Sequence, residues 1–207
     1  MAKIKYTKGE LKKQRDALRQ YRRYLPTLQL KKQQLQTEIL HQASFIEAAE
    51  LREKQKMRDA EIWAGLLSDP EVDLRRWLSP SKIITTFKNI AGVDIPVYER
   101  AEFDKAEYDL FLMPLWVDGG LEALRAIKAL REEIAVLRQG MEILKQELRT
   151  TTQRVNLFEK IKIPEAEDAI RRIKIYIGDQ MTNAVGRSKM AKNKIEKAIE
   201  AVERAAV

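Results

Sequence analysis

The stretch Arg149–Pro164, RTTTQRVNLFEKIKIP, decides how the rest of the sequence is interpreted. It lies in a long run of helix-forming residues that reaches the end of the chain. One stripe, at alternating steps of three and four residues, contains Leu148, Thr151, Val155 and Phe158. This spacing is typical of a helix that packs against a second helix. By its pattern alone, the stretch is a coiled-coil segment with a polar layer at Thr151.

The N-terminal part of the sequence offers the partner helix. Thr7-Lys8-Gly9-Glu10 has the pattern of a capping box, so we expect a helix to begin there. A heptad pattern of apolar residues then continues to about residue 67 without an insertion, which favours a coiled coil. Pro26 lies within this pattern, and because proline removes a backbone donor, we expect an interruption and a bend near it.

The two arms are expected to fold back on each other at the middle of the chain. The predicted fold is mainly α: a long antiparallel two-helix coiled coil formed by the N- and C-terminal arms, with a small insert that contains a β-hairpin. The predicted domains are residues 1–64, 65–120 and 121–207. The predicted seam between the helices consists of Leu11, Leu18, Leu25, Leu28, Leu35, Ile39, Ile46, Ile134, Leu137, Met141, Leu144, Leu148, Val155 and Phe158.

The insert combines two different sequence patterns. A β-branched run from Lys82, a turn over Ala91–Pro96 and an alternating run to Phe103 predict a hairpin at about residues 82–103. The segment Asp109–Asp118 encloses the most apolar piece of the chain. It either packs beneath the hairpin and against the helix ends, or forms an exposed docking patch. Gly119-Gly120 is expected to precede the second long helix.

The second arm is expected to continue past Pro164. At this proline the regular spacing of the apolar residues is interrupted. A stripe on a shifted face resumes with Ile170, Ile173 and Ile177. The periodicity predicts that the tail remains helical. If the arms pair as expected, the residues beyond about 184 extend past the N-terminus as a lone helix.

Composition excludes several kinds of chemistry. The chain has no cysteine and a single histidine, His41, so disulfides and thiol catalysis are excluded and a zinc site is not expected. No glycine opens a phosphate-binding loop. The longest charge-free apolar stretch, Leu110–Val117, is far shorter than the roughly 20 residues that a membrane-spanning helix needs. We therefore expect a non-catalytic protein without cofactor or metal, located in the cytoplasm, with no signal peptide and no direct membrane insertion.

Charge divides the sequence in the same way as the predicted domains. The net charge of +8 arises from two basic arms, because residues 65–120 are net acidic. Basic surfaces of this kind attract nucleic acids, anionic lipids or acidic protein surfaces.

The opening stretch also resembles a known signature. The pattern T-x-R-R-V-N-A-L-E followed by I-P is characteristic of the D subunit of V/A-type rotary ATPases. The positions matched to it are Thr151, Gln153, Arg154, Val155, Asn156, Leu157, Glu159, Ile163 and Pro164. Leu28–Leu35 resembles the N-terminal signature of this family, and Ile173–Ile177 resembles part of its C-terminal block. Of these positions, Thr151, Arg154, Val155, Asn156, Glu159 and Pro164 form the predicted family motif.

The resemblance implies a function. The D subunit is a non-catalytic rotor shaft in the central stalk, which couples ATP hydrolysis or synthesis in a catalytic ring to the transport of protons or other ions. It implies as partners the A and B subunits of the ring, the F subunit of the stalk and the socket subunit of the membrane rotor, and so a peripheral place in a membrane complex. Basic residues would make weakly directional contacts with acidic ring loops. The residues chosen for this role are Lys5, Lys8, Lys12, Lys13, Lys189 and Lys192.

Three other interpretations remain open from the sequence. A basic coiled-coil arm that binds nucleic acid fits the charge, although Tyr21 occupies the seam and no stacking platform is evident. A membrane-surface helix fits less well, because the apolar stripe is already used by the partner helix. A generic coiled-coil adaptor remains if the family resemblance is accidental.

Overall fold

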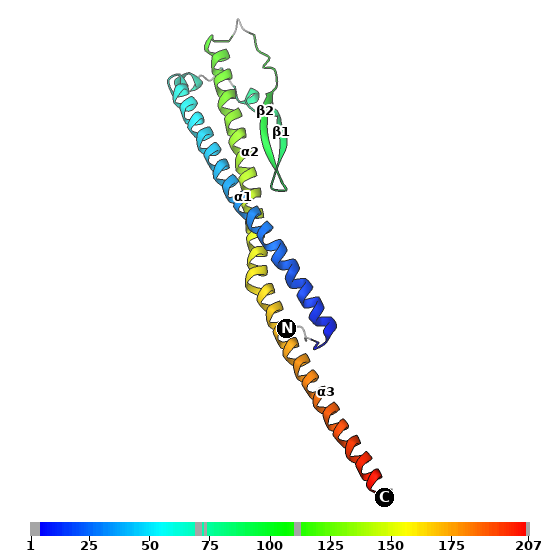
Figure 1. The fold of residues 1–207 in the computed structure, drawn as a ribbon. Helices are drawn as coiled ribbons and strands as arrows, with labels where there is room; N and C mark the ends of the chain where they lie inside the picture. Colours follow the sequence, from blue (N-terminus) through cyan, green and yellow to red (C-terminus); the bar gives the residue numbers. More distant parts are fainter. Residues whose placement is uncertain (1–4, 69–71, 73, 110–112, 206–207) are drawn as a thin grey trace. The chain divides into compact units, whose positions relative to one another are not determined.

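The computed structural model of the 207-residue chain describes residues 5–68, 72, 74–109 and 113–205. Its elements, in chain order, are helix α1 (Lys8–Glu61), the 3₁₀ turns η1 (Ala64–Ser68) and η2 (Arg75–Trp77), strands β1 (Pro80–Ile90) and β2 (Val93–Phe103), helix α2 (Trp116–Leu157), the π-helical turn η3 (Phe158–Lys162) and helix α3 (Ile163–Ala205) (Figure 1). The predicted mainly α fold, with a β-hairpin between two long helical arms, is confirmed.

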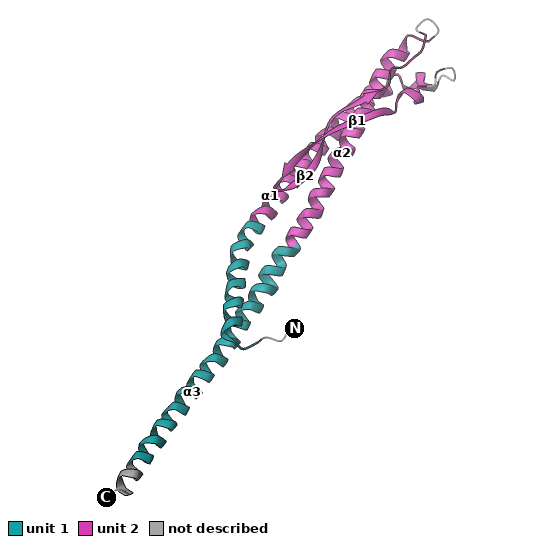
Figure 2. Ribbon diagram, turned by 90° about the vertical axis from the view of Figure 1, so that its right-hand side faces the viewer, with its two compact units in different colours: residues 1–29, 153–207 teal, residues 30–152 magenta. Residues whose placement is uncertain are grey.

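The chain forms two compact units, residues 30–152 and residues 1–29 with 153–207 (Figure 2). In the unit of residues 30–152, α1 and α2 run antiparallel. Ion pairs connect them in opposite chain order: Lys31 with Glu147 at 2.7 Å, Glu50 with Arg138 at 2.7 Å, and Glu53 with Arg131 at 2.7 Å. Exposed pairs of this kind add little stability, so the apolar seam between the helices supplies most of it.

The hairpin of this unit has a tighter turn than its sequence predicts. The strands pair in register from Ile90 opposite Val93, so the loop has only two residues, Ala91 and Gly92. Both have positive φ, 51° and 77°, as a type I′ turn requires. The Asn89 Oδ1 atom accepts a hydrogen bond from the Gly92 backbone N–H at 3.1 Å. The predicted turn over Ala91–Pro96 is therefore wrong in extent, because β2 begins at Val93.

The hairpin packs on the helix pair through one buried layer. Leu35 of α1, Leu144 of α2 and Ile95 of β2 are at most 1% exposed and contact one another. The strand lies directly against α2 at Gly140, where a Cβ atom would be in ordinary contact with the Pro96 carbonyl oxygen at 3.6 Å. The hairpin is therefore held by the same residues that join the helices.

The base of the hairpin is held by one arginine. The Arg125 guanidinium of α2 donates to the Trp77 carbonyl oxygen at 3.0 Å and to the Asp104 carbonyl oxygen at 2.6 Å. It also lies 5.3 Å from the centre of the Phe103 ring, within the range of a cation–π contact. Arg125 thus connects the chain on both sides of the hairpin to α2.

The apolar segment predicted at Asp109–Asp118 is partly described. Residues 110–112 lie outside the described residues. Val117 is 1% exposed and forms a core cluster with Val72 and Leu74, against which Met113 and Trp116 pack, whereas Leu115 is 98% exposed. The described part of the segment is therefore packed at Met113, Trp116 and Val117 and open at Leu115, so the packing alternative holds for only some of its residues.

Helix α2 begins before the two glycines that were expected to precede it. It starts at Trp116, so Gly119 and Gly120 lie inside its first turns. A Cβ atom at Gly120 would be 3.1 Å from the Trp116 ring and 3.3 Å from the Trp63 ring. Gly120 therefore serves the close packing of two tryptophans and does not mark the end of a loop.

The unit of residues 1–29 and 153–207 also contains an antiparallel helix pair. The Tyr6 and Tyr176 rings lie 5.1 Å apart, and the Tyr21 and Phe158 rings 5.3 Å apart. One half of the predicted capping box is present, since Thr7 Oγ1 accepts a hydrogen bond from the Glu10 backbone N–H at 3.2 Å. The other half differs, because the Thr7 backbone N–H donates to the Lys5 carbonyl oxygen at 3.0 Å and Glu10 accepts from Gln14. Helix α1 continues through Pro26, so the proline does not end the helix, and the bend expected near it stays a prediction.

The shift predicted for the apolar stripe after Pro164 is explained by a π-helical turn. Just before Pro164, the chain forms the π-helical turn η3, in which the Ile163 backbone N–H donates to the Phe158 carbonyl oxygen. This extra residue in the turn displaces the stripe, which resumes with Ala166, Ala169, Ile170 and Ile173, each at most 9% exposed. All described side chains from residue 178 to 199 are exposed. The tail is thus helical, as predicted, and its unpaired part begins earlier than residue 184.

We predict that Leu144→Ala destabilises the chain by about 2–5 kcal/mol, because it leaves a cavity in the layer with Leu35 and Ile95. Urea unfolding followed by far-UV circular dichroism measures this change. Leu30→Ala is the matched control, since Leu30 is 55% exposed, and it should change the free energy of unfolding by less than about 0.5 kcal/mol. Equal effects of the two substitutions would contradict the described core.

We also predict that Arg125→Ala loosens the base of the hairpin. Loss of the bonds to Trp77 and Asp104 should speed amide hydrogen exchange in residues 75–78 and 103–105 by roughly tenfold, as expected for loss of one or two charge-assisted hydrogen bonds. Arg149→Ala, at an exposed arginine of the same helix, is the control. Unchanged exchange in the Arg125 variant would show that the hairpin base is held by other contacts.

Candidate functional site

The described residues offer no site for catalysis by a metal ion. No group of three or more His, Asp or Glu side chains in the described ranges is placed to hold a metal. Within the same residues, no helix has the length and apolar character needed to span a bilayer. The features that can carry function are therefore surfaces.

The predicted seam residues all lie on inward-facing positions of the helices. Those buried are Leu35, Ile46, Ile134, Leu144 and Val155. Those half-buried are Leu11, Leu18, Leu25, Leu28, Ile39, Leu137, Met141, Leu148 and Phe158. In α1 the buried residues lie between 35 and 49, whereas in the second arm they continue from Val117 to Ile173.

The predicted family motif separates into inward and outward side chains. Thr151 and Val155 are 1% and 5% exposed and belong to the helix contact. Four members are exposed: Arg154, Asn156, Glu159 and Pro164. Packing within the chain does not require these four side chains, so they are available to a partner.

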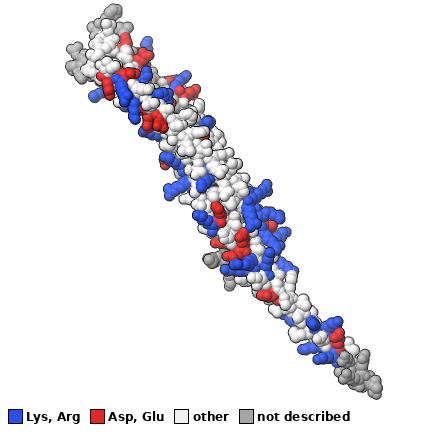
Figure 3. Space-filling view, turned by 60° about the vertical axis from the view of Figure 1, so that its left-hand side comes forward, with Lys and Arg blue, Asp and Glu red and all other residues white. Residues whose placement is uncertain are grey.

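The basic residues chosen from the sequence are all exposed: Lys5, Lys8, Lys12, Lys13, Lys189 and Lys192. Figure 3 shows Lys and Arg side chains gathered over the start of α1 and again over the C-terminal part of α3. Lys192 lies 3.6 Å from Glu196. No ion pair joins the lysines of the first turns of α1 to an acidic residue in the described part of the chain. These lysines are thus free to attract an acidic partner.

Sequence reasoning missed a second contact face of α2. Val136 is 8% exposed, Gly140 is buried, and Ile143 packs against the layer that contains Ile95 of the hairpin. These residues recur at steps of four and three beside the main seam. That spacing was the available signal for a helix that packs against two neighbours.

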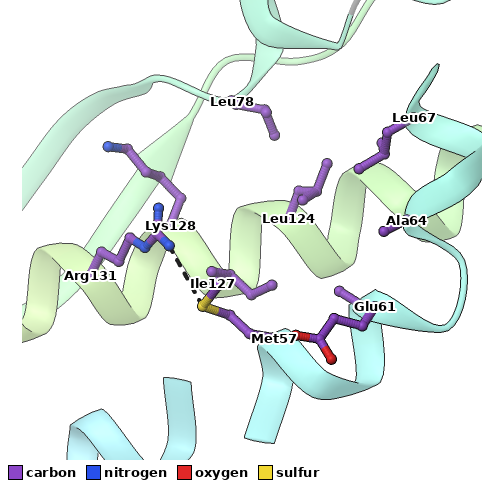
Figure 4. A pocket seen from close by; sticks show the side chains of 10 residues that line it. Met57, Glu61, Ala64, Leu67, Leu78, Leu124, Ile127, Lys128 and Arg131 are labelled. Atoms are coloured by element: carbon purple, nitrogen blue, oxygen red, sulfur yellow. Dashed lines mark hydrogen bonds between the residues drawn. The ribbon is translucent and has the colours of Figure 1, made fainter. Parts of the chain in front are cut away.

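An apolar cleft, also missed, lies between the end of α1 and the start of α2 (Figure 4). Its volume is about 280 Å³, and its apolar wall includes Met57, Leu67, Leu124 and Ile127. Lys128 and Arg131 stand at its edge, but both are engaged: Lys128 with Glu132 at 3.2 Å and Arg131 with Glu53 at 2.7 Å. The one carboxylate of the lining, Glu61, is exposed to solvent, so the cleft offers no pair of groups for acid–base catalysis.

Two tyrosines near the hairpin have perturbed acidity. A hydrogen bond from the Tyr108 hydroxyl to the Asp118 carboxylate raises the pKa of Tyr108, and partial burial adds to this. Partial burial, with smaller effects of Glu133 and Glu132, raises the pKa of Tyr98 against the opposing effect of a backbone hydrogen bond at Ala101. Both phenols are neutral at physiological pH and act as structural groups.

Comparison with known proteins identifies the family. The family model described as the D subunit of ATP synthase matches residues 10–193. The chain belongs to this family. It is 41% identical to the V-type ATP synthase D subunit of Borreliella burgdorferi over 95% of this chain and 97% of that protein. It is 34% identical to the protein of the same name from Chlamydia pneumoniae, over 93% of each, and 33% identical to that of Chlamydia felis, over 94% and 95%.

Membership of the D-subunit family confirms the resemblance found at Thr151–Pro164. Members of this family are non-catalytic stalk subunits of V-type ATPases, so the prediction that the chain is not an enzyme is also confirmed. The comparisons support the stalk interpretation over a nucleic-acid-binding arm or a generic adaptor.

We predict that Tyr108 contributes stability that is lost at alkaline pH. Because its folded-state pKa is raised above the unfolded value of 10.0, this contribution is fully present below pH 10.0 and disappears as pH rises through the folded pKa. Tyr108→Phe should therefore show a smaller fall in the free energy of unfolding than the wild type above pH 10.0, measured by urea titration. Tyr24→Phe, at a tyrosine 55% exposed, should behave like the wild type. Identical pH profiles for the wild type and the Tyr108 variant would contradict the role of the Asp118 contact.

Proposed function

We propose that this chain is the rotor shaft in the central stalk of a V-type ATPase and couples nucleotide turnover in a catalytic ring to ion transport. The observation that carries the proposal is the match to the ATP synthase D-subunit family over residues 10–193, in a chain whose described part has antiparallel helix pairs. The curated relatives are named as subunits of a V-type ATP synthase. The chain would accordingly assemble with other subunits of such a complex.

The helix pair suits a mechanical role. In residues 30–152, the buried seam and the cross-helix ion pairs, such as Arg138 with Glu50 at 2.7 Å, oppose sliding and twisting of one helix against the other. A shaft can bias the conformation of a ring only by contacting its open and closed states unequally. Exposed side chains that differ around the helix pair provide such unequal contacts.

The partners proposed for this role are those that the family resemblance implies, and the exposed surfaces suggest where they would bind. The A and B subunits of the ring would contact the basic residues at the start of α1 and in the tail of α3, with Lys8, Lys12 and Lys189 among them. The F subunit of the stalk and the socket subunit of the membrane rotor would bind the remaining exposed surfaces. The chain would thus be peripheral to the membrane, held there by the complex and on its cytoplasmic side.

Co-expression with ring subunits tests the proposal. Steady-state ATP hydrolysis by purified ring subunits should change when this chain is added, and the chain should co-purify with them at a fixed stoichiometry. A control chain that carries Leu35→Asp and Leu144→Asp, which disrupt the seam, should leave hydrolysis at the level of the ring alone. Hydrolysis unaffected by the wild-type chain would contradict the proposal.

Neutralising the basic residues should act on the rate of assembly. We predict that Lys8→Gln, Lys12→Gln and Lys13→Gln together lower the association rate with the ring roughly tenfold at low salt and reduce its dependence on ionic strength, because long-range attraction steers association. Stopped-flow measurements at several salt concentrations provide the rates. Lys54→Gln, Lys56→Gln and Arg58→Gln, which remove three exposed cations near the other end of α1, are the matched control. Equal rates for the two triple variants would count against steering by the start of α1.

A further inference from the structure

The outer edge of β1 has no partner strand among the described residues. The sheet has two strands, and β1 pairs with β2 alone. Strand β2 is the one that approaches α2, since the Pro96 carbonyl oxygen lies 3.6 Å from the Cβ position of Gly140. In Figure 1, β1 lies on the side of the hairpin away from α2. No backbone hydrogen bond connects β1 to a third described segment.

The usual protections of an edge strand lie outside the centre of β1. Edge strands are commonly blocked by bulges, prolines and charged side chains, lysine in particular. Pro80 and a bulge at Ser81 stand at the start of β1, and the charged side chains of the strand are Lys82 and Lys88. The second bulge, at Glu99, is on the inner strand β2. The five residues between the two lysines are therefore regular and uncharged.

The centre of β1 is well suited to strand pairing. Between its two lysines, β1 reads Ile83-Ile84-Thr85-Thr86-Phe87, all β-branched or aromatic and all uncharged. Phe87 is 74% exposed and Ile83 is 38% exposed. An added strand would gain main-chain hydrogen bonds along this window and cover apolar side chains that the chain itself leaves open.

The two lysines select the kind of strand that can bind. In an antiparallel pair of copies centred on Thr85, Lys82 of one copy stands opposite Lys88 of the other, and a parallel pair in register places each lysine beside its counterpart. Like charges directly opposite are destabilising, so the edge is protected against a second copy of this chain. Lys82 and Lys88 form no ion pair within the described residues. Acidic residues at both ends of an added strand would pair with them.

We propose that the outer edge of β1 binds an extended segment of a different protein by strand addition, and that this segment has an uncharged, β-forming centre with an acidic residue at each end. The main chain supplies the affinity, and Lys82 and Lys88 set the register and exclude self-association. This surface is separate from the basic residues assigned above to the ring, and the inference does not depend on rotor function.

Peptide binding to the full chain tests the proposal. The probe is a fluorescently labelled peptide, Glu-Val-Thr-Val-Thr-Val-Glu, whose acidic residues have the same spacing as Lys82 and Lys88. Fluorescence anisotropy should show saturable binding at least about tenfold tighter than that of the same peptide with lysines at both ends. On binding, the amides of residues 82–88 should become protected from hydrogen exchange. The peptide Glu-Pro-Pro-Pro-Pro-Pro-Glu keeps the charges but lacks the central N–H donors on both of its edges, so it should not bind whichever direction the added strand runs.

A charge exchange at Lys88 makes the test sharper. Lys88→Glu is suitable because Lys88 stands opposite the uncharged Ile95, whereas Lys82 stands opposite Glu102. This variant should bind the acidic peptide at least about threefold more weakly, and one of the two peptides with a single terminal lysine should regain the affinity. Which of the two recovers reveals the direction of the added strand. Absence of binding, binding that the prolines do not abolish, or a preference that Lys88→Glu does not shift would each overturn the proposal.

Discussion

The contact between α1 and α2 at Leu35 and Leu144 is the constraint on which the unit of residues 30–152 depends. Both side chains are fully buried, and neither helix alone could remove them from water. A two-stranded hairpin is also marginal by itself in water. It becomes stable here because Ile95 of β2 completes the same layer. One apolar layer thus joins three elements from distant parts of the sequence.

Two buried residues at the contacts between α1, α2 and the hairpin are not apolar side chains: Gln42 and Gly140. Gln42 is 7% exposed on the seam, and its side-chain oxygen has no hydrogen-bond partner among the described residues. An unsatisfied buried amide costs stability but disfavours other alignments of the two helices. Gly140 is buried where α2 meets the hairpin. The seam therefore combines strong apolar layers with a position that limits the alternatives.

The long elements could be predicted from the sequence because their signals are local. The capping residue Thr7, the uninterrupted heptads and the motif at Thr151–Pro164 together indicated two paired helical arms and the family. The turn at Ala91 and Gly92 could not be read in the same way, since alanine rarely adopts positive φ. Gly120 was wrongly placed before the helix, because only the folded structure shows that it lies inside α2 against the Trp63 and Trp116 rings. The second face of α2, with Val136, became evident only with the hairpin in place.

Function in this chain is a property of exposed surfaces supported by a buried seam. The proposed function requires the chain to rotate within a ring. Single-molecule observation tests this most directly. The sequence has no cysteine, so Ile62→Cys, at a residue 88% exposed, gives one attachment point for a bead on a complex whose ring is fixed to a surface. If the chain is a rotor shaft, the bead should rotate in one direction when ATP is added, and its rotation rate should rise with the rate of ATP hydrolysis. A bead that stays still while the ring hydrolyses ATP would contradict it.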